Sequence, residues 1–343
     1  MTLSRRTLLA AGLGAAAMPA LSYGPARAAS IPLRAGVIPI IGASPLFVAD
    51  KEGWFKDSGL DLTVTTFQSG PNTIQALASG TIDLYVAGIA PLGVARSRGI
   101  DIKVVAATAT GENVFVATPQ LAAHFTEGVT PAEAFARFRD ATGKPARLAT
   151  QPSGSVPNTT LQYWLWERIK ADPGDVEIVA MGIDATQQAV LADAVEGATV
   201  REPALTIIRK TNPAVRLIAV GDELFPGQPG TVAAVSGAFL KSHPGAVEAL
   251  VGALIKAEAL ITRDPARAAP HVAAALGPGI VDVETVTAAL TSPASKFLID
   301  PRQIIGPAKA MQSYQVKLGS LAEDAPLDAL FDTSFFEKAK AAG

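Results

Sequence analysis

The stretch that decides the fold is residues 68–93, Gln-Ser-Gly-Pro-Asn-Thr-Ile-Gln-Ala-Leu-Ala-Ser-Gly-Thr-Ile-Asp-Leu-Tyr-Val-Ala-Gly-Ile-Ala-Pro-Leu-Gly. Pro71 predicts the first turn of a helix, because its missing N–H would find no partner there. Gly80 suits the left-handed cap that ends a helix, and residues 82–87 then predict a buried strand. Pro91 begins a second helix. Because both strand-to-helix junctions fall at one edge of a parallel sheet, we expect ligands to bind at that edge.

The same alternation of strands and helices extends on both sides of this stretch. Strands are predicted over 33–40, 60–67 and 102–107, with helices between them. This α/β order implies a mainly parallel sheet with right-handed crossovers. A second α/β unit begins at residues 146–150. The C-terminal part is predicted to be helical, over about 237–263, 265–276, 282–291 and 300–319.

This order predicts an α/β protein of two lobes, each a mainly parallel sheet flanked by helices, with a ligand cleft between the lobes. Residues 29–115 and 225–343 form lobe one, and residues 116–224 form lobe two, inserted between them. The chain then crosses between the lobes twice, which predicts a hinge. A chain of 343 residues is long enough for two globular domains of ordinary size.

The first 28 residues predict a signal peptide of the twin-arginine type. Ser4-Arg5-Arg6-Thr7-Leu8-Leu9 is followed by an Ala/Leu/Gly run through Leu21 and by the small-x-small site Ala26-Arg27-Ala28. A buried N-terminal helix is disfavoured because paired arginines, a short apolar run and a cleavage site occur in the right order. We expect cleavage after Ala28 and a periplasmic mature protein, although Arg-Arg leaders can also use the general secretory route.

Composition excludes several kinds of protein. The chain has no cysteine, which removes disulfides, Cys-ligated metals, thiol nucleophiles and a lipid-anchored Cys after the leader. The formal net charge of −2 with scattered Lys and Arg gives no reason to expect nucleic acid or an anionic membrane as a partner. Past residue 30 no apolar run approaches the ~20 residues that span a bilayer.

Signals of an enzyme are weak. The three histidines, His124, His243 and His271, lie far apart and lack the spacing of metal ligands. No Gly-x-Ser-x-Gly, Walker or His-Glu-x-x-His motif occurs. We therefore expect no cofactor, no metal and no catalytic residue.

Several short segments occur in the order found in one known family. The chain resembles the periplasmic solute-binding proteins of nitrate, sulfonate and taurine ABC importers, a class that includes thiamine-precursor binders. The matching segments are Ala43-Ser-Pro-Leu-Phe-Val-Ala-Asp-Lys-Glu-Gly-Trp-Phe55, Phe67-Gln-Ser-Gly-Pro71, Leu77-Ala-Ser-Gly-Thr-Ile-Asp-Leu84, Gly154-Ser155, Asp175-Val-Glu-Ile178, Glu202-Pro203 and His243-Pro244. The resemblance implies the type II two-lobed fold, substrate between the lobes and no catalysis. It also implies an ABC permease and its ATPase subunit as partners, and we expect a monomer.

One segment departs from the family pattern. Members usually carry Gly-x-x-Asp-Ala and an aromatic residue just before Glu-Pro, whereas here Arg201 stands where a Trp is common. This segment lines the cleft from lobe two in the family. The departure therefore leaves the subclass of ligand open.

Five predicted helix starts share one pattern and would meet at the cleft: Ser44-Pro45, Gly70-Pro71, Ala90-Pro91, Ser155-Val-Pro157 and Glu202-Pro203. Each presents free N–H groups and about half a positive charge from the helix dipole. Facing one cleft, they would bind an anion or a dipole largely through the backbone. The alternative is that they are ordinary helix starts with nothing bound.

The predicted ligand-binding residues are small polar groups and glycines at these junctions: Ser44, Gln68, Ser69, Gly70, Gly88, Ile89, Ser153, Gly154, Ser155, Asn158, Arg201 and Glu202. Ser44 and Ser155 are also expected to cap their helices. Glu202 is expected to cap its own helix rather than contact a ligand. Arg201 could pair bidentately with a carboxylate, sulfonate or phosphonate, but a salt bridge to Glu202 or Asp184 is slightly favoured.

The ligand and two other functions stay open. Taurine, alkanesulfonate, nitrate, an aromatic acid, or a neutral pyrimidine stacked on Phe47, Tyr85 or Trp164 would all suit such a site. A ligand sensor that signals to a membrane kinase and an exported enzyme on the same fold are the alternatives to a transport protein.

Overall fold

The computed structural model describes residues 30–277, 279–324 and 326–342. The predicted signal peptide, residues 1–28, and its cleavage site lie outside these described residues. The predictions on fold and on the ligand site all fall within them.

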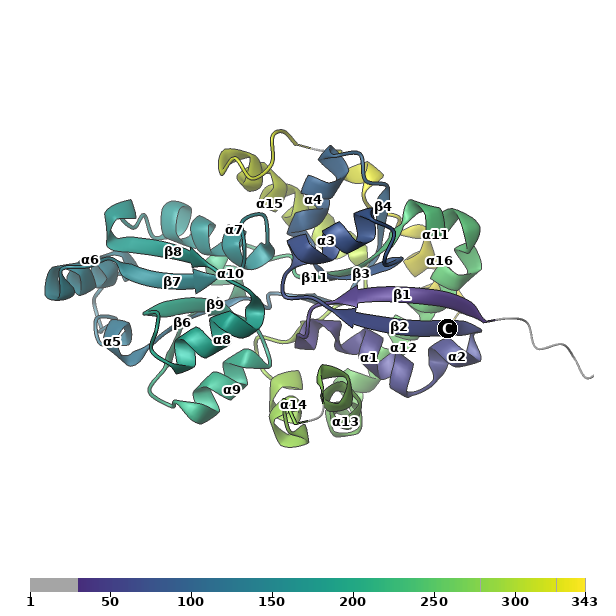
Figure 1. The fold of residues 1–343 in the computed structure, drawn as a ribbon, viewed down its shortest axis with the longest axis horizontal. Helices are drawn as coiled ribbons and strands as arrows, with labels where there is room; N and C mark the ends of the chain where they lie inside the picture. The colour runs from purple at the N-terminus through teal and green to yellow at the C-terminus, as the bar shows by residue number, and fades with distance from the viewer. Residues whose placement is uncertain (1–29, 278, 325, 343) are drawn as a thin grey trace, which may run out of the picture.

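Two five-stranded sheets form the centres of two lobes (Figure 1). The first sheet has the strand order β2-β1-β3-β11-β4, and the second has the order β10-β6-β9-β7-β8. The first contains β1 (Ile31–Val37), β2 (Leu60–Thr66), β3 (Leu84–Gly88), β4 (Ile102–Ala107) and β11 (Thr231–Ser236). The second contains β6 (Val114–Ala117), β7 (Ala146–Thr150), β8 (Val176–Ala180), β9 (Gly197–Val200) and β10 (Arg216–Ala219). A separate ribbon pairs β5 (Ala109–Thr110) with β12 (Lys296–Phe297), which the sequence did not predict.

Each sheet is mainly parallel, as predicted, with one reversed strand. In the first sheet β11 runs antiparallel to both of its neighbours, β3 and β4. In the second sheet β6 runs antiparallel to both β9 and β10. Both reversed strands directly follow a crossing between the lobes, since β6 follows β4 and β11 follows β10. A strand that arrives from the other lobe enters its sheet at the interface and must run away from it.

Helices cover both faces of each sheet (Figure 1). Those around the first sheet are α1 (Ser44–Lys51), α2 (Trp54–Asp57), α3 (Gly70–Ala78), α4 (Ala90–Ser97), α11 (Gly237–Ser242), α12 (Pro244–Arg263) and α16 (Ser334–Ala342). Those around the second are α5 (Pro119–Ala122), α6 (Pro131–Thr142), α7 (Val156–Tyr163), α8 (Ile183–Leu191), α9 (Ala204–Thr211) and α10 (Gly221–Leu224). In the described part of the chain, no helix has the length and apolar character needed to cross a bilayer.

Three further helices of the C-terminal segment are α13 (Pro265–Leu276), α14 (Val283–Leu290) and α15 (Ile305–Lys317). Helix α13 packs on α1 and α12 of lobe one, α14 reaches α9 of lobe two, and α15 contacts both α4 and α7. Short turns occur at Ile41–Ala43, Pro173–Asp175, Pro301–Ile304 and Leu327–Ala329, and a π-helical turn at Trp164–Arg168. The C-terminal segment therefore lies against both lobes.

Most predicted helix starts are confirmed, with two corrections. Ser69 and Ser155 cap α3 and α7 by accepting from the backbone N–H groups three residues on. Ser44, however, is not an N-cap: it is the first residue of α1, because the preceding turn already places Ala43 in a helical conformation. The helix predicted over 237–263 is broken into α11 and α12 at His243, since Pro244 cannot continue a helix from that residue.

Successive side chains of β6 point to opposite faces of the second sheet, so part of the core of lobe two lies on each face. Phe115 packs on one face against Phe135 and Trp164, with ring centroids 6.2 and 4.8 Å away. Its neighbour Val116 packs on the other face with Val190 and other aliphatic residues. Trp164 therefore lies in the core of lobe two, so the suggestion that it stacks on a ligand is wrong.

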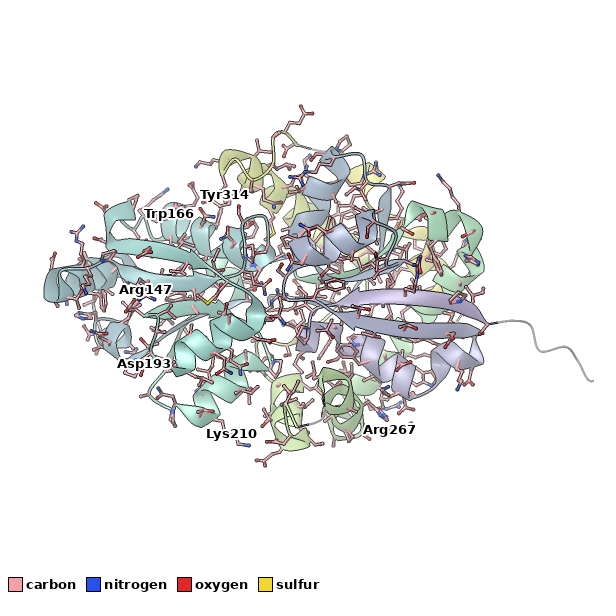
Figure 2. The ribbon with its side chains drawn as sticks, viewed as in Figure 1. Arg147, Trp166, Asp193, Lys210, Arg267 and Tyr314 are labelled. Carbon is pink, nitrogen blue, oxygen red and sulfur yellow. The ribbon has the colours of Figure 1, made fainter. Side chains whose placement is uncertain are left out.

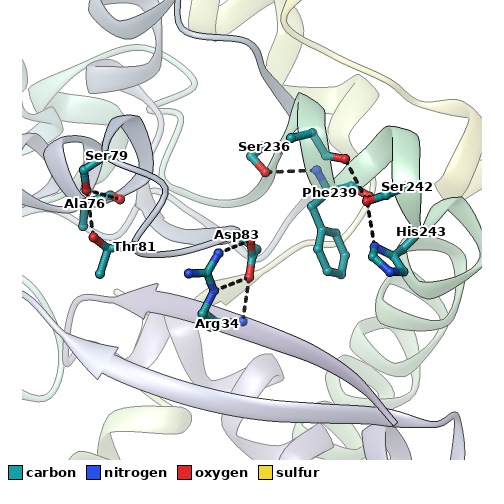
Figure 3. A network of polar contacts seen from close by, with 10 residues as sticks. Arg34, Ala76, Ser79, Thr81, Asp83, Ser236, Phe239, Ser242 and His243 are labelled. Atoms are coloured by element: carbon teal, nitrogen blue, oxygen red, sulfur yellow. Dashed lines mark hydrogen bonds and ion pairs between the residues drawn. The ribbon is translucent and has the colours of Figure 1, made fainter. Parts of the chain in front are cut away.

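Polar contacts fix the first sheet at the end away from lobe two (Figure 3). The guanidinium of Arg34 in β1 pairs with the carboxylate of Asp83 just before β3, with Nη2–Oδ1 at 2.7 Å and Nε–Oδ2 at 2.8 Å. Ser236, at the end of β11, donates its N–H to the Asp83 carbonyl and caps α11 by accepting from Phe239. These contacts set the register of three strands whose opposite ends reach the interface.

The carboxylate of Glu52 ties α13 to the end of α1. It accepts from Nε and Nη2 of Arg267 at 3.1 and 2.6 Å and lies 2.9 Å from Nε2 of His271. The side chain of Glu52 is only 11% exposed. Hydrogen bonds from Arg267 hold the pKa of Glu52 below its ordinary value of 4.5.

This cluster predicts a pH-dependent contribution to stability. Because the pKa of Glu52 is lower in the folded state, its stabilising effect is fully present at neutral pH and is lost as the pH falls below 4.5. We expect Glu52→Gln to lower the free energy of unfolding at pH 7, and the difference from the unmodified protein to shrink at acidic pH. Urea denaturation at several pH values tests this; a constant difference from pH 7 to pH 3 would contradict it.

Candidate functional site

The candidate site lies where the carboxyl ends of strands from both lobes meet. Gln68, after β2, donates from Nε2 to Oδ2 of Asp184 at 2.8 Å, and its carbonyl accepts from the N–H of Ile183. The N–H of Ile41 donates to the carbonyl of Glu202 at 3.0 Å. These bonds join lobe one to the segments that open α8 and α9 of lobe two. Three of the predicted junctions therefore lie close together.

Arg201 is the most informative residue of the site. It follows β9 directly, only 3% of it is exposed, and its Nε and Nη1 have no hydrogen-bond partner. Within the part of the chain that the structure describes, it forms no ion pair. Burial lowers the pKa of its guanidinium, opposed by the charge of Glu112. A buried cation with two free donors is a strong binding site for an anion.

The predicted salt bridge from Arg201 to Glu202 or Asp184 is wrong, because both carboxylates have other partners. Glu202 caps α9: its two oxygens accept from the N–H and the hydroxyl of Thr206, each at 3.0 Å. The capping role predicted for Glu202 is thus confirmed. Asp184 accepts from Gln68 across the interface.

Glu112 is a residue of the site that the sequence did not single out. It lies at the first crossing between the lobes, 3% exposed, and its Oε2 accepts from both N–H and Oγ1 of Thr231 at the second crossing, each at 2.7 Å. A Cβ on Gly42 would come within 1.9 Å of Oε1 of Glu112, so only glycine fits there. A lone acid between the two apolar strands 102–107 and 114–117 was the only signal for it.

Two further polar atoms at the junctions are buried without a partner. Oγ of Ser44 is fully covered, and Oε1 of Gln151, after β7, belongs to a residue that is 4% exposed. Gln151 and Arg201 line the same small cavity of about 10 Å³, together with Thr199 and Pro157. A space of that size holds about one water molecule. Ser44 was predicted from its position, whereas Gln151 was not.

Two of the predicted glycines, Gly70 and Gly88, lie where side chains of other segments come close to the backbone. A Cβ on Gly70 would come within 2.8 Å of Pro91 and 2.9 Å of the hydroxyl of Tyr85. Tyr85 is buried and donates to the carbonyl of Gly88 at 2.6 Å, and burial raises its pKa. A Cβ on Gly88 would come within 2.8 Å of Val156 in lobe two. Gly70 and Gly88 therefore let the helix starts and the two lobes pack together.

The remaining predicted residues have varied surroundings. Ser153 is exposed, whereas Asn158 is buried and accepts from Gln162 at 2.7 Å. The carbonyl of Gly154 accepts from Gln315 of α15 at 3.3 Å, and the N–H of Ile89 donates to Gly230. None of these contacts tests a role in ligand binding.

A larger cavity of about 250 Å³ opens beside Arg201. It is lined by Pro39, Thr66, Ile183, Asp184, Gln187, Arg201, Glu202, Pro203, Ala204, Ile207, Leu276, Ile280 and Val281. It thus lies between the ends of β1 and β2, the helices α8 and α9, and the linker from α13 to α14. The structure, over its described residues, brings no three His, Asp or Glu side chains together in a way that could hold a metal ion.

The contact between Gly88 and Val156 yields a test of the interface. We expect Gly88→Ala to lower the free energy of unfolding by about 1–3 kcal/mol, because the added methyl group overlaps Val156. The double variant with Val156→Ala should recover part of this loss, which a double-mutant cycle by urea denaturation would measure. Gly252→Ala is the control, since its Cβ would meet no atom within 4 Å. Additive effects in the cycle would contradict the contact.

The NMT1-like family matches residues 27–277. A protein of Brucella abortus that carries the provisional name of a binding protein is 26% identical over 226 residues, 65% of this chain. The chain spans 63% of the length of that relative.

Solved structures show the same fold at low identity. The periplasmic nitrate-binding protein NrtA from Synechocystis PCC 6803 has a TM-score of 0.76 at 16% identity, over 91% of this chain and 89% of that one. The alkanesulfonate-binding protein SsuA from Xanthomonas axonopodis pv. citri, bound to MOPS, has a TM-score of 0.69 at 19% identity, over 89% of this chain and 100% of that one. The predicted two-lobed periplasmic-binding-protein fold is confirmed, and the chain belongs to the NMT1-like family.

Proposed function

We propose that this protein is the substrate-binding component of an ABC import system and that it captures a small anion between its two lobes. The observation that carries the proposal is the buried guanidinium of Arg201, whose Nε and Nη1 have no partner. A carboxylate, sulfonate or phosphonate can accept from both groups at once, in the side-on geometry that arginine favours.

The energetics of burial support an anionic ligand. An uncompensated buried charge costs several kcal/mol after relaxation, and Glu112 acts on Arg201 only through space. An anion at the free N–H groups supplies the missing partner. The helix starts at Ser44 and Val156 add N–H groups and dipoles of the same sign around the interface. The ligand therefore favours the arrangement in which the lobes are closed on it.

The names of similar proteins support the same class of function. The structural relatives are described as binding nitrate and an alkanesulfonate, and they share the two-lobed fold. In the proposed function this protein binds its solute without changing it covalently and acts as a monomer. It delivers the solute to a membrane permease that works with an ATPase subunit. The leader, residues 1–28, exports it to the periplasm.

The crossings at Glu112 and Thr231 support a hinge with lobe boundaries near residues 115 and 225. The first crossing joins β4 to β6 and the second joins β10 to β11. Around the ligand we place Ser44, Gln68, Ser69, Gly70, Gly88, Ile89, Ser153, Gly154, Ser155, Asn158, Arg201 and Glu202, to which we add Gln151.

Substitution of Arg201 tests the anion site. We expect Arg201→Ala to weaken binding of an anion such as acetate, methanesulfonate or nitrate by at least about 100-fold, because a charge-assisted bidentate contact is lost. Isothermal titration calorimetry on the purified mature protein measures the affinities. The Arg201→Lys variant should bind the anion more tightly than Arg201→Ala but more weakly than the unmodified protein, because an ammonium lacks the planar pair of donors.

Arg168→Ala is the matched control, since Arg168 lies exposed in lobe two. Equal affinities of the Arg201→Ala variant and the unmodified protein for an anion would contradict the assignment. Mass spectrometry of the anion recovered after incubation tests whether the protein only binds, and a chemical change in it would indicate an enzyme instead.

A further inference from the structure

The cavity of about 250 Å³ beside Arg201 has two kinds of wall. Its apolar side consists of Pro39, Ile183, Ile207, Leu276, Ile280 and Val281. Its polar side consists of Thr66, Asp184, Gln187 and Glu202, with Arg201 shared with the small cavity at Gln151. A molecule that pairs with Arg201 can therefore extend directly into a larger, mostly apolar space.

Polar contacts hold the walls of this cavity in place. Lys210, in the last turn of α9, lies on the side of lobe two next to α14 (Figure 2). Its Nζ is 3.5 Å from Oδ2 of Asp282 and 3.3 Å from Oγ1 of Thr285 in α14. On the opposite side, Gln68 of lobe one is bonded to Asp184 of α8. These contacts join α9 to the start of α14, just after Ile280, and join lobe one to α8.

Building on the proposed function, we propose that this cavity is the subsite for the apolar body of an organic monoanion whose charged group pairs with Arg201. An apolar cavity of about 150 Å³ is already large enough to hold benzene, so a space of about 250 Å³ accepts a ring or a branched alkyl group. An inorganic anion would occupy Arg201 and leave the apolar wall uncovered.

The charge of the wall limits the ligand to one anionic group. Asp184 and Glu202 both line the cavity, and the carboxylate of Glu202 already accepts two hydrogen bonds from Thr206. Neither has a free donor to offer a second anionic group, and Asp184 would repel it. An aromatic or alkyl monocarboxylate or monosulfonate fits this combination, whereas a dicarboxylate of the same size does not.

Matched pairs of anions test the subsite by isothermal titration calorimetry. Each buried methylene strengthens binding by about fourfold. We therefore expect benzoate to bind at least about tenfold more tightly than acetate, and benzenesulfonate at least about tenfold more tightly than methanesulfonate. Phthalate, which adds a second carboxylate to benzoate, should bind at least about tenfold more weakly than benzoate.

Two variants alter the apolar wall of the cavity. Ile207→Trp fills the cavity and Ile280→Asp adds a carboxylate on a residue that is 71% exposed, so the latter variant should fold normally. Both should abolish the advantage of benzoate over acetate while leaving the affinity for acetate within about threefold. Val283→Asp is the control, since Val283 is 44% exposed in the same segment but does not line the cavity.

The outcomes separate the subsite from the proposed function. If acetate and nitrate bind as tightly as benzoate and all three depend on Arg201, the subsite is wrong and the anion-binding function stands. If benzoate keeps its advantage in both wall variants, the apolar body lies elsewhere and the subsite is again wrong. If no anion shows binding that depends on Arg201, the proposed function fails and the subsite fails with it.

Discussion

The structure depends on a guanidinium that is buried between two lobes without a carboxylate against it. Moving a charge out of water costs several kcal/mol, and a protein usually offsets that cost with an ion pair. Here the two nearest candidates in the sequence, Glu202 and Asp184, are held by Thr206 and Gln68. The contacts of one lobe with the other therefore enclose a charge that neither lobe neutralises. In the proposed function, an anion from solution completes this arrangement.

The two crossings between the lobes bear on how the lobes respond to a ligand in the proposed function. Both crossings are tied together by buried polar contacts: Glu112 accepts from Thr231, and Oε1 of Gln228 accepts from the N–H and the amide of Asn113 at 2.7 and 3.1 Å. Buried hydrogen bonds therefore join the two crossings into one unit, which serves as the hinge in the proposed function. Contacts away from the crossings, such as Gln68 with Asp184, are exposed and involve few atoms. Breaking such exposed contacts requires less free energy than breaking the buried ones at the crossings.

Local signals in the sequence predicted the framework, because they act through nearby residues. Pro71, Pro91 and Pro157 mark helix starts by the missing N–H, and Ser69 and Ser155 cap helices by short-range bonds. Features that depend on residues far apart in the sequence could not be predicted from such local signals. The reversed strands β6 and β11 follow from the path of the chain between lobes, and the pairing of β5 with β12 joins segments almost 200 residues apart.

The same distinction holds for the site. Arg201 was identified because it departs from a family pattern. Whether it has an ion-pair partner depends on the hydrogen bonds that Glu202 and Asp184 form in the folded protein, with Thr206 and Gln68. Gln151 carries no local signal, and the lone acid Glu112 carries only a weak one, since a buried carboxylate and an exposed one look alike in a sequence. The sequence therefore predicted the helix starts at these junctions and not the polar network between them.

The departure at Arg201 connects the cleft to the cavity beside it. An aromatic residue at this position offers a face for stacking and a large apolar volume. Arginine offers two directed donors and a charge, and here it lines the same cavity as Ile207 and Ile280. In the proposed function, one side chain then recognises the charge, and a separate wall recognises the apolar body. Two independent surfaces of this kind discriminate among anions more sharply than charge alone, because each must be matched at once.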